Sequence, residues 1–323
     1  MRIPNMEIFS LLLVVLALCL FEMVNSIDNA IIDADILNGV KKKSRRVFMF
    51  FDILFAVLIV RGLLPWLIVF LTIPSLGFFG AFSASFSEDP IVVNSIAETA
   101  PLLLVGAGVF FVLLFLDWIF RKPKHFAHLH ERILHGRDEL FHIFAVILLA
   151  LMLFVSLALA PQFILPVFIG FTVFFVLHGL KSQFNLHKSS IVSGEKKNLS
   201  DFKKLTYLEI IDSVFSIDSV LGAFAFTFSV PIIIIGAGLG AVVVRIITLK
   251  NTEHLKKYSY LRNGAMYSVF FLGIIMIFEA FDFDFPIWFS SLVTMAIIFY
   301  FVHKSHKEAK LLHDLGVPIY KKS

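Results

Sequence analysis

The sequence predicts an all-α, polytopic membrane protein. Of its 323 residues, 59% are hydrophobic and only 16% are charged, whereas a soluble domain has about 25% charged residues. The mean hydropathy is +0.89. Long apolar stretches alternate with short charged joints, and about 20 apolar residues are enough to cross a bilayer as a helix. We therefore expect one transmembrane domain over residues 1–323, surrounded by the lipid bilayer.

Nine segments are predicted to cross the membrane. Each one ends where turn-forming or charged residues gather, as in "NGVKKKSRR", "SEDP" and "DFDFP", because such residues are poorly tolerated in the hydrocarbon region. The first segment is too long for one straight crossing, so it must either break or extend beyond the membrane. In chain order, the segments cover residues 8–38, 47–73, 98–120, 139–159, 162–180, 205–228, 231–249, 264–281 and 286–303.

The positions of the basic residues predict the orientation. All but three of the 28 Lys and Arg residues fall in alternate joints or the C-terminal tail, and the joints 74–97, 160–161, 229–230 and 282–285 contain none. The positive-inside rule then predicts that the N-terminus lies outside and the C-terminus in the cytoplasm. The predicted location is the plasma (inner) membrane. The net charge of +4 therefore reflects orientation, and we expect no nucleic-acid partner.

The N-terminal segment also has features of a secretory signal peptide. Arg2 precedes the apolar run 8–21, and small or polar residues follow near 24–26. A polar motif beside this run recurs far downstream, which favours a segment that stays attached. The single cysteine, Cys19, excludes a disulfide framework and a cysteine metal cage.

The recurring motif consists of acidic residues around Ser-Ile-Asp. "EMVNSIDNAIID" begins at Glu22, and "DSVFSIDSVLGA" begins at Asp212. Glu22 matches Asp212, and Asp28 matches Asp218. Both motifs lie in predicted spans, where an ionised Asp costs roughly 2.5–3.5 kcal/mol on insertion scales. Because this cost arises in both motifs, we predict that these carboxylates have a function in the membrane.

The duplication is predicted to be an inverted repeat. Each copy carries an intramembrane arginine in the next span, Arg61 or Arg245, which we expect to balance charge or gate access. The two motifs are five spans apart, and an odd offset reverses the direction of the second copy. Many transporters bind substrate at the midplane between such repeats. Repeat 1 covers about 8–120, connecting spans cover about 139–180, and repeat 2 covers about 205–303.

The two motifs offer only oxygen ligands. On a regular helix Glu22, Asn25, Asn29 and Asp33 form one stripe, and Glu209, Asp212, Ser216 and Ser219 form another. Asp28 and Asp218 lie off these stripes, so the motifs would converge more easily if each helix broke near Ser-Ile-Asp. Carboxylate, amide and hydroxyl oxygens suit hard cations such as Mn²⁺, Mg²⁺ or Ca²⁺. The alternative is that the polar groups only hydrogen-bond between helices.

These residues resemble the TerC-like (tellurium-resistance) integral membrane proteins, within the wider LysE-like exporter superfamily. The resemblance rests on "FEMVNSIDNAII", "LEIIDSVFSIDSVLGAFAF", "AVLIVRG" and "GAVVVRI". It implies export of a divalent metal cation, with Mn²⁺ favoured, and exchange against protons is a reasonable mode of coupling. The metal is substrate, and no cofactor is expected. The implied metal-binding residues are Glu22, Asn25, Asp28, Asn29, Glu209, Asp212, Asp218 and Ser219.

Other features point less strongly to function. The joint 121–138 contains several histidines, which either collect metal or belong to a solvated helical loop that also holds Glu131. "GAGLG" at 236–240 has the glycine spacing of close helix packing. No enzyme is expected, although Asp28 and Asp218 could form the dyad of an intramembrane aspartyl protease. A membrane scaffold or assembly factor that transports nothing is the main alternative.

Overall fold

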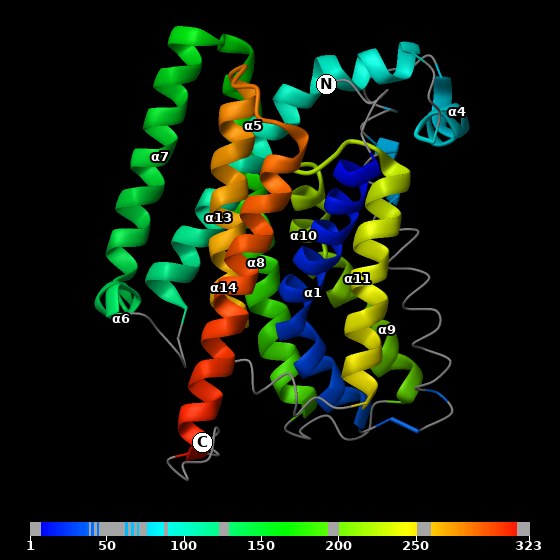
Figure 1. Ribbon diagram of the computed structural model, residues 1–323, viewed down its shortest axis with the longest axis vertical. Helices are drawn as coiled ribbons and strands as arrows, with labels where there is room; N and C mark the ends of the chain where they lie inside the picture. The colour runs from blue at the N-terminus through cyan, green and yellow to red at the C-terminus, as the bar shows by residue number, and fades with distance from the viewer. Residues whose placement is uncertain are drawn as a thin grey trace.

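The computed structural model is a bundle of long helices (Figure 1). It describes residues 8–38, 40–41, 44, 62–63, 66–67, 70, 76–86, 90–122, 129–192, 200–250 and 260–314. Within these residues the chain forms helices and no strands. In chain order they are α1 (Ile8–Asn38), α4 (Gly77–Ala84), α5 (Pro90–Arg121), α6 (Leu129–Leu134), α7 (Asp138–Leu159), the 3-10 turn η3 (Pro161–Phe163), α8 (Ile164–Val192), α9 (Asp201–Phe215), α10 (Ile217–Ala223), α11 (Val230–Lys250), α13 (Leu261–Ala280) and α14 (Ile287–Asp314).

Seven stretches in the described residues are long and apolar enough to cross a membrane. The chain is therefore an all-α, polytopic membrane protein, as its composition predicts. Of the two other predicted spans, 47–73 falls almost entirely outside the described residues, and 205–228 is not one continuous helix. The seven stretches are Ile8–Ser26, Ile96–Arg121, Asp138–Leu159, Pro161–Gln183, Val230–Ile247, Leu261–Ala280 and Ile287–Leu311.

The predicted span 205–228 breaks at the second acidic motif. α9 ends at Phe215, α10 begins at Ile217, and Ser216 between them is a turn residue. The break near Ser-Ile-Asp is thus confirmed for the second motif. At the first motif no break occurs, because α1 continues through Ser26-Ile27-Asp28 as one 31-residue helix. The alternative for this segment, an extension beyond the membrane, stays a prediction.

The chain between α10 and α11 is not helical, yet its side chains are buried. Phe224, Phe226 and Phe228 all lie inside the protein. Backbone N–H groups in this stretch have acceptors, as non-helical backbone at membrane depth requires. The amides of Phe226 and Thr227 donate to the Ala223 carbonyl at 3.0 and 3.1 Å, and that of Ser229 donates to Thr227 Oγ1 at 3.1 Å.

The helices alternate in direction along the bundle (Figure 1). α1, α5, α8, α11 and α14 run downwards in this view, whereas α7 and α13 run upwards. The connection from α7 to α8 and that from α13 to α14 lie at the top of this view. Residues 160–161 and 282–285 in these connections include no Lys or Arg. Helix ends beside the basic joints lie in the lower part, so the charge asymmetry of the sequence corresponds to two different ends of the bundle.

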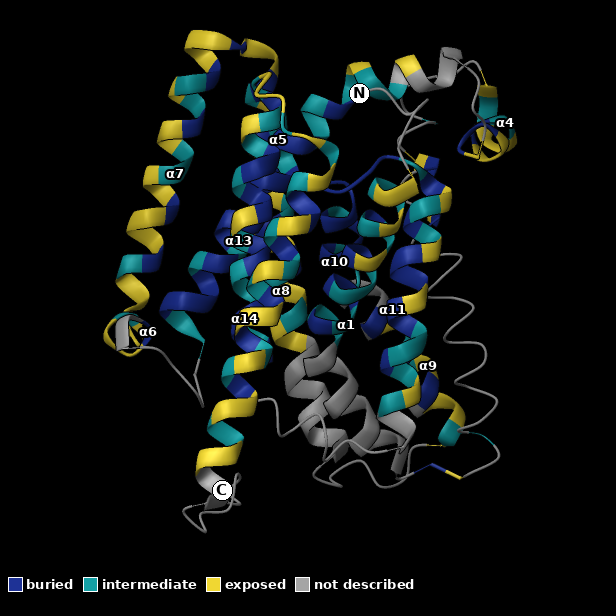
Figure 2. Cartoon of the chain, viewed as in Figure 1, coloured by how far each residue is buried: buried dark blue, intermediate teal, exposed yellow. Residues whose placement is uncertain are grey.

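The core is built around α5, the most buried of the membrane-length helices, whereas α7 is the least buried. α5 packs most extensively against α13 and next against α8, and α1 packs chiefly against α11. Figure 2 shows buried residues in the middle of the bundle and exposed ones along the outer helices α7 and α14. Exposed apolar residues on α7 include Phe154 and Leu157, which is typical of a surface covered by lipid.

Two glycines allow α5 and α13 to touch backbone to backbone. A methyl group added at Gly108 would lie 2.7 Å from the Gly273 carbonyl oxygen and from Ile277 Cγ1. One added at Gly273 would lie 2.8 Å from Phe111 Cβ and 3.0 Å from the Gly108 carbonyl oxygen. Each glycine therefore makes room for the other helix at the same crossing, the small-residue packing expected between membrane helices.

We predict that Gly108→Ala destabilises the protein and that Gly179→Ala does not. The Gly108 methyl group has no space, and overpacking costs about 1–3 kcal/mol. Gly179 on α8 has no atom of another residue within 4 Å of an added methyl group, and alanine favours a helix by about 1 kcal/mol. The apparent melting temperature in detergent should fall for the first variant only. A loss of equal size in both would show that the crossing is not tightly packed.

Candidate functional site

The close packing of α1 against α11 places the first acidic motif inside the bundle. A methyl group added at Gly236 would lie 2.7 Å from Leu18 Cβ, and one at Gly240 would lie 2.5 Å from the Cys19 carbonyl oxygen and 2.7 Å from Glu22 Cβ. The two glycines are one helical turn apart on α11, so they present one bare stripe to α1. The predicted packing role of "GAGLG" is confirmed, and its second glycine lies directly against Glu22.

The predicted site has four described carboxylates, and three of them, Glu22 among them, are buried. The relative exposure is 2% for Glu22 and 8% for both Asp212 and Asp218. Ser26, one turn further along α1, donates its hydroxyl to Glu22 Oε1 at 2.7 Å. This hydrogen bond gives one oxygen of the Glu22 carboxylate a partner that carries no charge.

One hydrogen bond joins the two acidic motifs. Asn25 on α1 donates through Nδ2 to Ser219 Oγ on α10 at 2.8 Å, across 194 residues of sequence. Phe21, on the preceding turn of α1, packs against Gly222 of α10, where an added methyl group would lie 2.5 Å from its ring. The structure therefore brings together the two motifs that the sequence identified as copies.

Asp212 is paired with Arg245, the intramembrane arginine of the second copy. The guanidinium donates through Nη2 to Asp212 Oδ2 at 2.6 Å, and both side chains are mostly buried. The guanidinium therefore lies inside the bundle, beside a carboxylate of opposite charge on α9. Both predicted roles of Arg245, charge balance and gating of access, stay predictions.

Asp218 is paired with a residue that the sequence did not single out. Lys181 on α8 donates through Nζ to Asp218 Oδ2 at 3.1 Å. Both side chains are largely buried, at 16% and 11% exposure. Because α10 begins only at Ile217, the helix break places Asp218 within reach of α8, and the motif carboxylates Asp212 and Asp218 each have their own cation.

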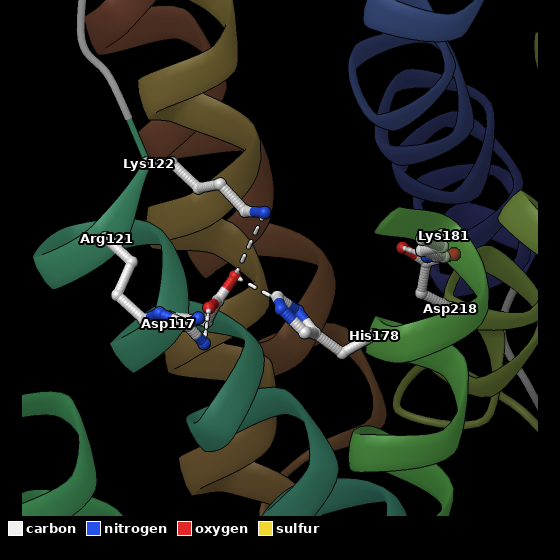
Figure 3. A network of polar contacts seen from close by, with 6 residues as sticks. All are labelled: Asp117, Arg121, Lys122, His178, Lys181 and Asp218. Carbon is white, nitrogen blue, oxygen red and sulfur yellow. Dashed lines mark hydrogen bonds and ion pairs between the residues drawn. The ribbon is translucent and has the colours of Figure 1, made fainter. Parts of the chain in front are cut away.

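A further buried carboxylate, outside the predicted site, lies on the other side of α8 (Figure 3). Asp117 on α5 is 2% exposed and is surrounded by Arg121 Nη1 at 3.1 Å, Lys122 Nζ at 3.6 Å and His178 Nδ1 at 3.5 Å. His178 precedes Lys181 by three residues, so α8 contacts both acidic centres. The sequence signal for this cluster is a single Asp within an apolar stretch, "FLDWIF", which the prediction passed over.

The remaining predicted residues are placed as follows. Glu209 on α9 is half-buried one turn before Asp212, and Ser219 is buried on α10. Asp28, Asn29 and Asp33 lie on α1, but their side chains are outside the described residues, and Arg61 is outside them altogether.

The described site is rich in oxygen atoms, and two of its carboxylates are paired with cations. Within the described residues, no three His, Cys, Asp or Glu side chains gather as a group able to hold a metal ion. Instead, cationic side chains hold Asp212 and Asp218, and hydroxyl and amide groups lie between the two motifs. A cation that binds Asp212 Oδ2 or Asp218 Oδ2 would compete with Arg245 or Lys181.

The joint before α7 is less solvated than its composition suggested. Glu131 on α6 is fully buried, and it accepts hydrogen bonds from Asn263 Nδ2 at 2.8 Å and from the Tyr267 hydroxyl at 3.1 Å, both on α13. The prediction of a purely solvated loop is wrong at this residue, because α6 folds back onto the bundle. His135 is exposed, and His142 Nδ1 lies 2.9 Å from the Asp138 carbonyl oxygen.

A comparison with models of known protein families finds a match over residues 27–311, to a family described as "Protein of unknown function (DUF475)". The chain belongs to this family. The matched region contains the second acidic motif and the later part of the first. No curated protein and no solved structure matches the chain. Since the family description assigns no activity, the function must be argued from the site.

We predict that Arg245→Gln destabilises the protein strongly and that adding Asp212→Asn restores much of the loss. Removing one partner of a buried ion pair leaves an uncompensated charge and costs about 3–5 kcal/mol, whereas removing both charges leaves two amides able to hydrogen-bond. Apparent melting temperatures of the two single variants and the double variant measure this coupling. The exposed Arg137→Gln serves as the matched control, and an equal effect in that variant would contradict the pairing.

Proposed function

We propose that the protein is an integral membrane transporter of the TerC-like type that exports a divalent metal cation, with Mn²⁺ favoured. The observation that carries the proposal is the Asn25–Ser219 hydrogen bond, which unites two acidic motifs 194 residues apart. Around it, Glu22, Asp212 and Asp218 are buried among apolar helices. Intramembrane carboxylates are costly and are typical of ion pathways.

The chemistry of the site supports a hard cation as substrate. Carboxylate, amide and hydroxyl oxygens are the ligands that Mn²⁺, Mg²⁺ and Ca²⁺ prefer, whereas Zn²⁺ and copper favour imidazole and thiolate. Lys181 and Arg245 balance two of the carboxylates while no substrate is bound. The choice of Mn²⁺ and the outward direction rest on the resemblance to TerC-like proteins.

Two features support the inverted repeat on which alternating access would rest. α5 and α13 occupy corresponding places in the two predicted copies and run in opposite directions (Figure 1). Their contact is also reciprocal, since Gly108 meets Gly273 and Ile277, while Gly273 meets Gly108 and Phe111. A contact made the same way by two antiparallel elements is what a two-fold axis in the membrane plane produces.

The basic ends of the helices support the proposed orientation. With these ends in the cytoplasm, the N-terminus lies outside and the C-terminus inside a plasma (inner) membrane. A cation leaving the cell would then enter the site from the end where Lys181 and Arg245 lie, since Gln183 and Ile247 close the apolar stretches of α8 and α11.

Asp28→Asn and Asp218→Asn are each expected to abolish metal export while the protein still inserts. Each change removes one anionic ligand but keeps the size of the side chain and one oxygen acceptor. Cells that depend on the protein for Mn²⁺ export should accumulate Mn²⁺ with either variant, to the level of cells that lack it. The exposed Asp138→Asn on α7 is the control and should export normally. Normal intracellular Mn²⁺ with Asp218→Asn would exclude this carboxylate from the site.

Purified protein in liposomes tests the proposed function directly. Vesicles that contain a metal-sensitive dye are given Mn²⁺, Mg²⁺ or Ca²⁺ with and without an imposed pH gradient. We expect Mn²⁺ flux to be the fastest and to respond to the gradient, since carboxylates that bind a cation release protons. Folded, inserted protein that moves none of the three cations would refute transport and favour a scaffold or assembly function.

A further inference from the structure

We propose that Lys181 is a built-in substitute for the transported cation: its ammonium group occupies Asp218 when the site is empty and leaves when Mn²⁺ binds. This inference rests on the proposed transport function and deepens it. The starting observation is the 3.1 Å contact between Lys181 Nζ and Asp218 Oδ2, made by two largely buried side chains from different helices. Asp218 Oδ1 is buried and has no hydrogen-bond partner among the described residues.

The two internal cations of the site are not equivalent. Arg245 contacts Asp212 at 2.6 Å, and its rigid, planar guanidinium suits a lasting carboxylate pair. Lys181 contacts Asp218 at 3.1 Å through a compact charge on a flexible four-carbon chain. The lysine is therefore the cation that can be displaced, and the arginine is the one that stays.

A released Lys181 has a place to go. The apolar stretch of α8 ends at Gln183, and the side chains of Ser182 and Gln183 are already exposed. A lysine this close to the end of a membrane helix can extend its ammonium group to the headgroup region. The nearby carboxylate Asp117 does not compete for it, because Arg121, Lys122 and His178 already surround that group (Figure 3).

The substitution matters for the return of the empty carrier. An alternating-access carrier must pass its site across the membrane both with Mn²⁺ and without it. In the passage without Mn²⁺, a carboxylate that has neither a proton nor a cation is costly to bury. Mn²⁺ neutralises Asp218 in the loaded state, and Lys181 neutralises it in the empty state. Loss of the lysine should then stop only the steps that involve the empty site.

Two flux measurements on protein in liposomes separate these steps. Net flux, measured as Mn²⁺ entry into vesicles without Mn²⁺, requires the empty site to return. Exchange, measured with radioactive Mn²⁺ outside and unlabelled Mn²⁺ inside, uses only the loaded site. For Lys181→Gln we expect net flux to fall about a hundredfold while exchange stays near the wild-type rate. Lys181→Arg keeps the charge and should retain net flux, and the exposed Lys203→Gln on α9 should change neither.

Each other result overturns the inference. Wild-type net flux in Lys181→Gln would show that the ammonium group is dispensable. Loss of both net flux and exchange in a folded variant would show that Lys181 helps to bind the substrate or to shape the site. Lys181→Met repeats the test with an uncharged side chain of similar length, and failure of both uncharged variants to fold would assign Lys181 to the fold alone. Wild-type protein without net flux or exchange would instead refute the proposed transport function itself.

Discussion

Buried negative charge is the constraint around which the bundle is organised. Three carboxylates near the contact of α1 with α10 lie inside apolar helices, and each has a specific partner. Ser26 donates a hydrogen bond to Glu22, Arg245 forms an ion pair with Asp212, and Lys181 forms an ion pair with Asp218. These partners come from α1, α11 and α8, so balancing the charges also determines which helices must surround the site.

The helix packing that meets this constraint depends on small residues. Gly236 and Gly240 bring α11 against α1, so that Glu22 is covered by backbone rather than by a bulky side chain. Gly108 and Gly273 do the same for α5 and α13. In lipid, apolar side chains gain little from leaving their surroundings, so close backbone contact has to supply the specificity. Four glycines therefore have as much influence on the arrangement as the many phenylalanines around them.

Much of this could be predicted from the sequence, because charges and glycines are rare in membrane helices and therefore stand out. The duplicated motif, the close-packing role of "GAGLG" and most span positions follow from such signals. The pairing of Lys181 with Asp218 could not be predicted from the sequence. The positive-inside rule already accounts for a lysine at the end of an apolar segment, and no sequence signal indicates that its side chain points into the bundle. Asp117 was missed because it has no counterpart in the repeat. The structure has a break at Ser216 in the second motif, whereas α1 is continuous through the first motif, and nothing in the two similar motifs explains this difference.

The stretch between α10 and α11 has a consequence for how the site communicates with its surroundings. Peptide groups that are not in a helix cannot be exposed to hydrocarbon, so residues 224–229 must be enclosed by protein or face water. Residues 224–228 are all buried, which fulfils this requirement. The same enclosure separates the neighbouring carboxylates from the acyl chains. In the proposed transporter, ions and water would therefore approach along the length of the bundle, from one aqueous compartment or the other, and not sideways from the membrane.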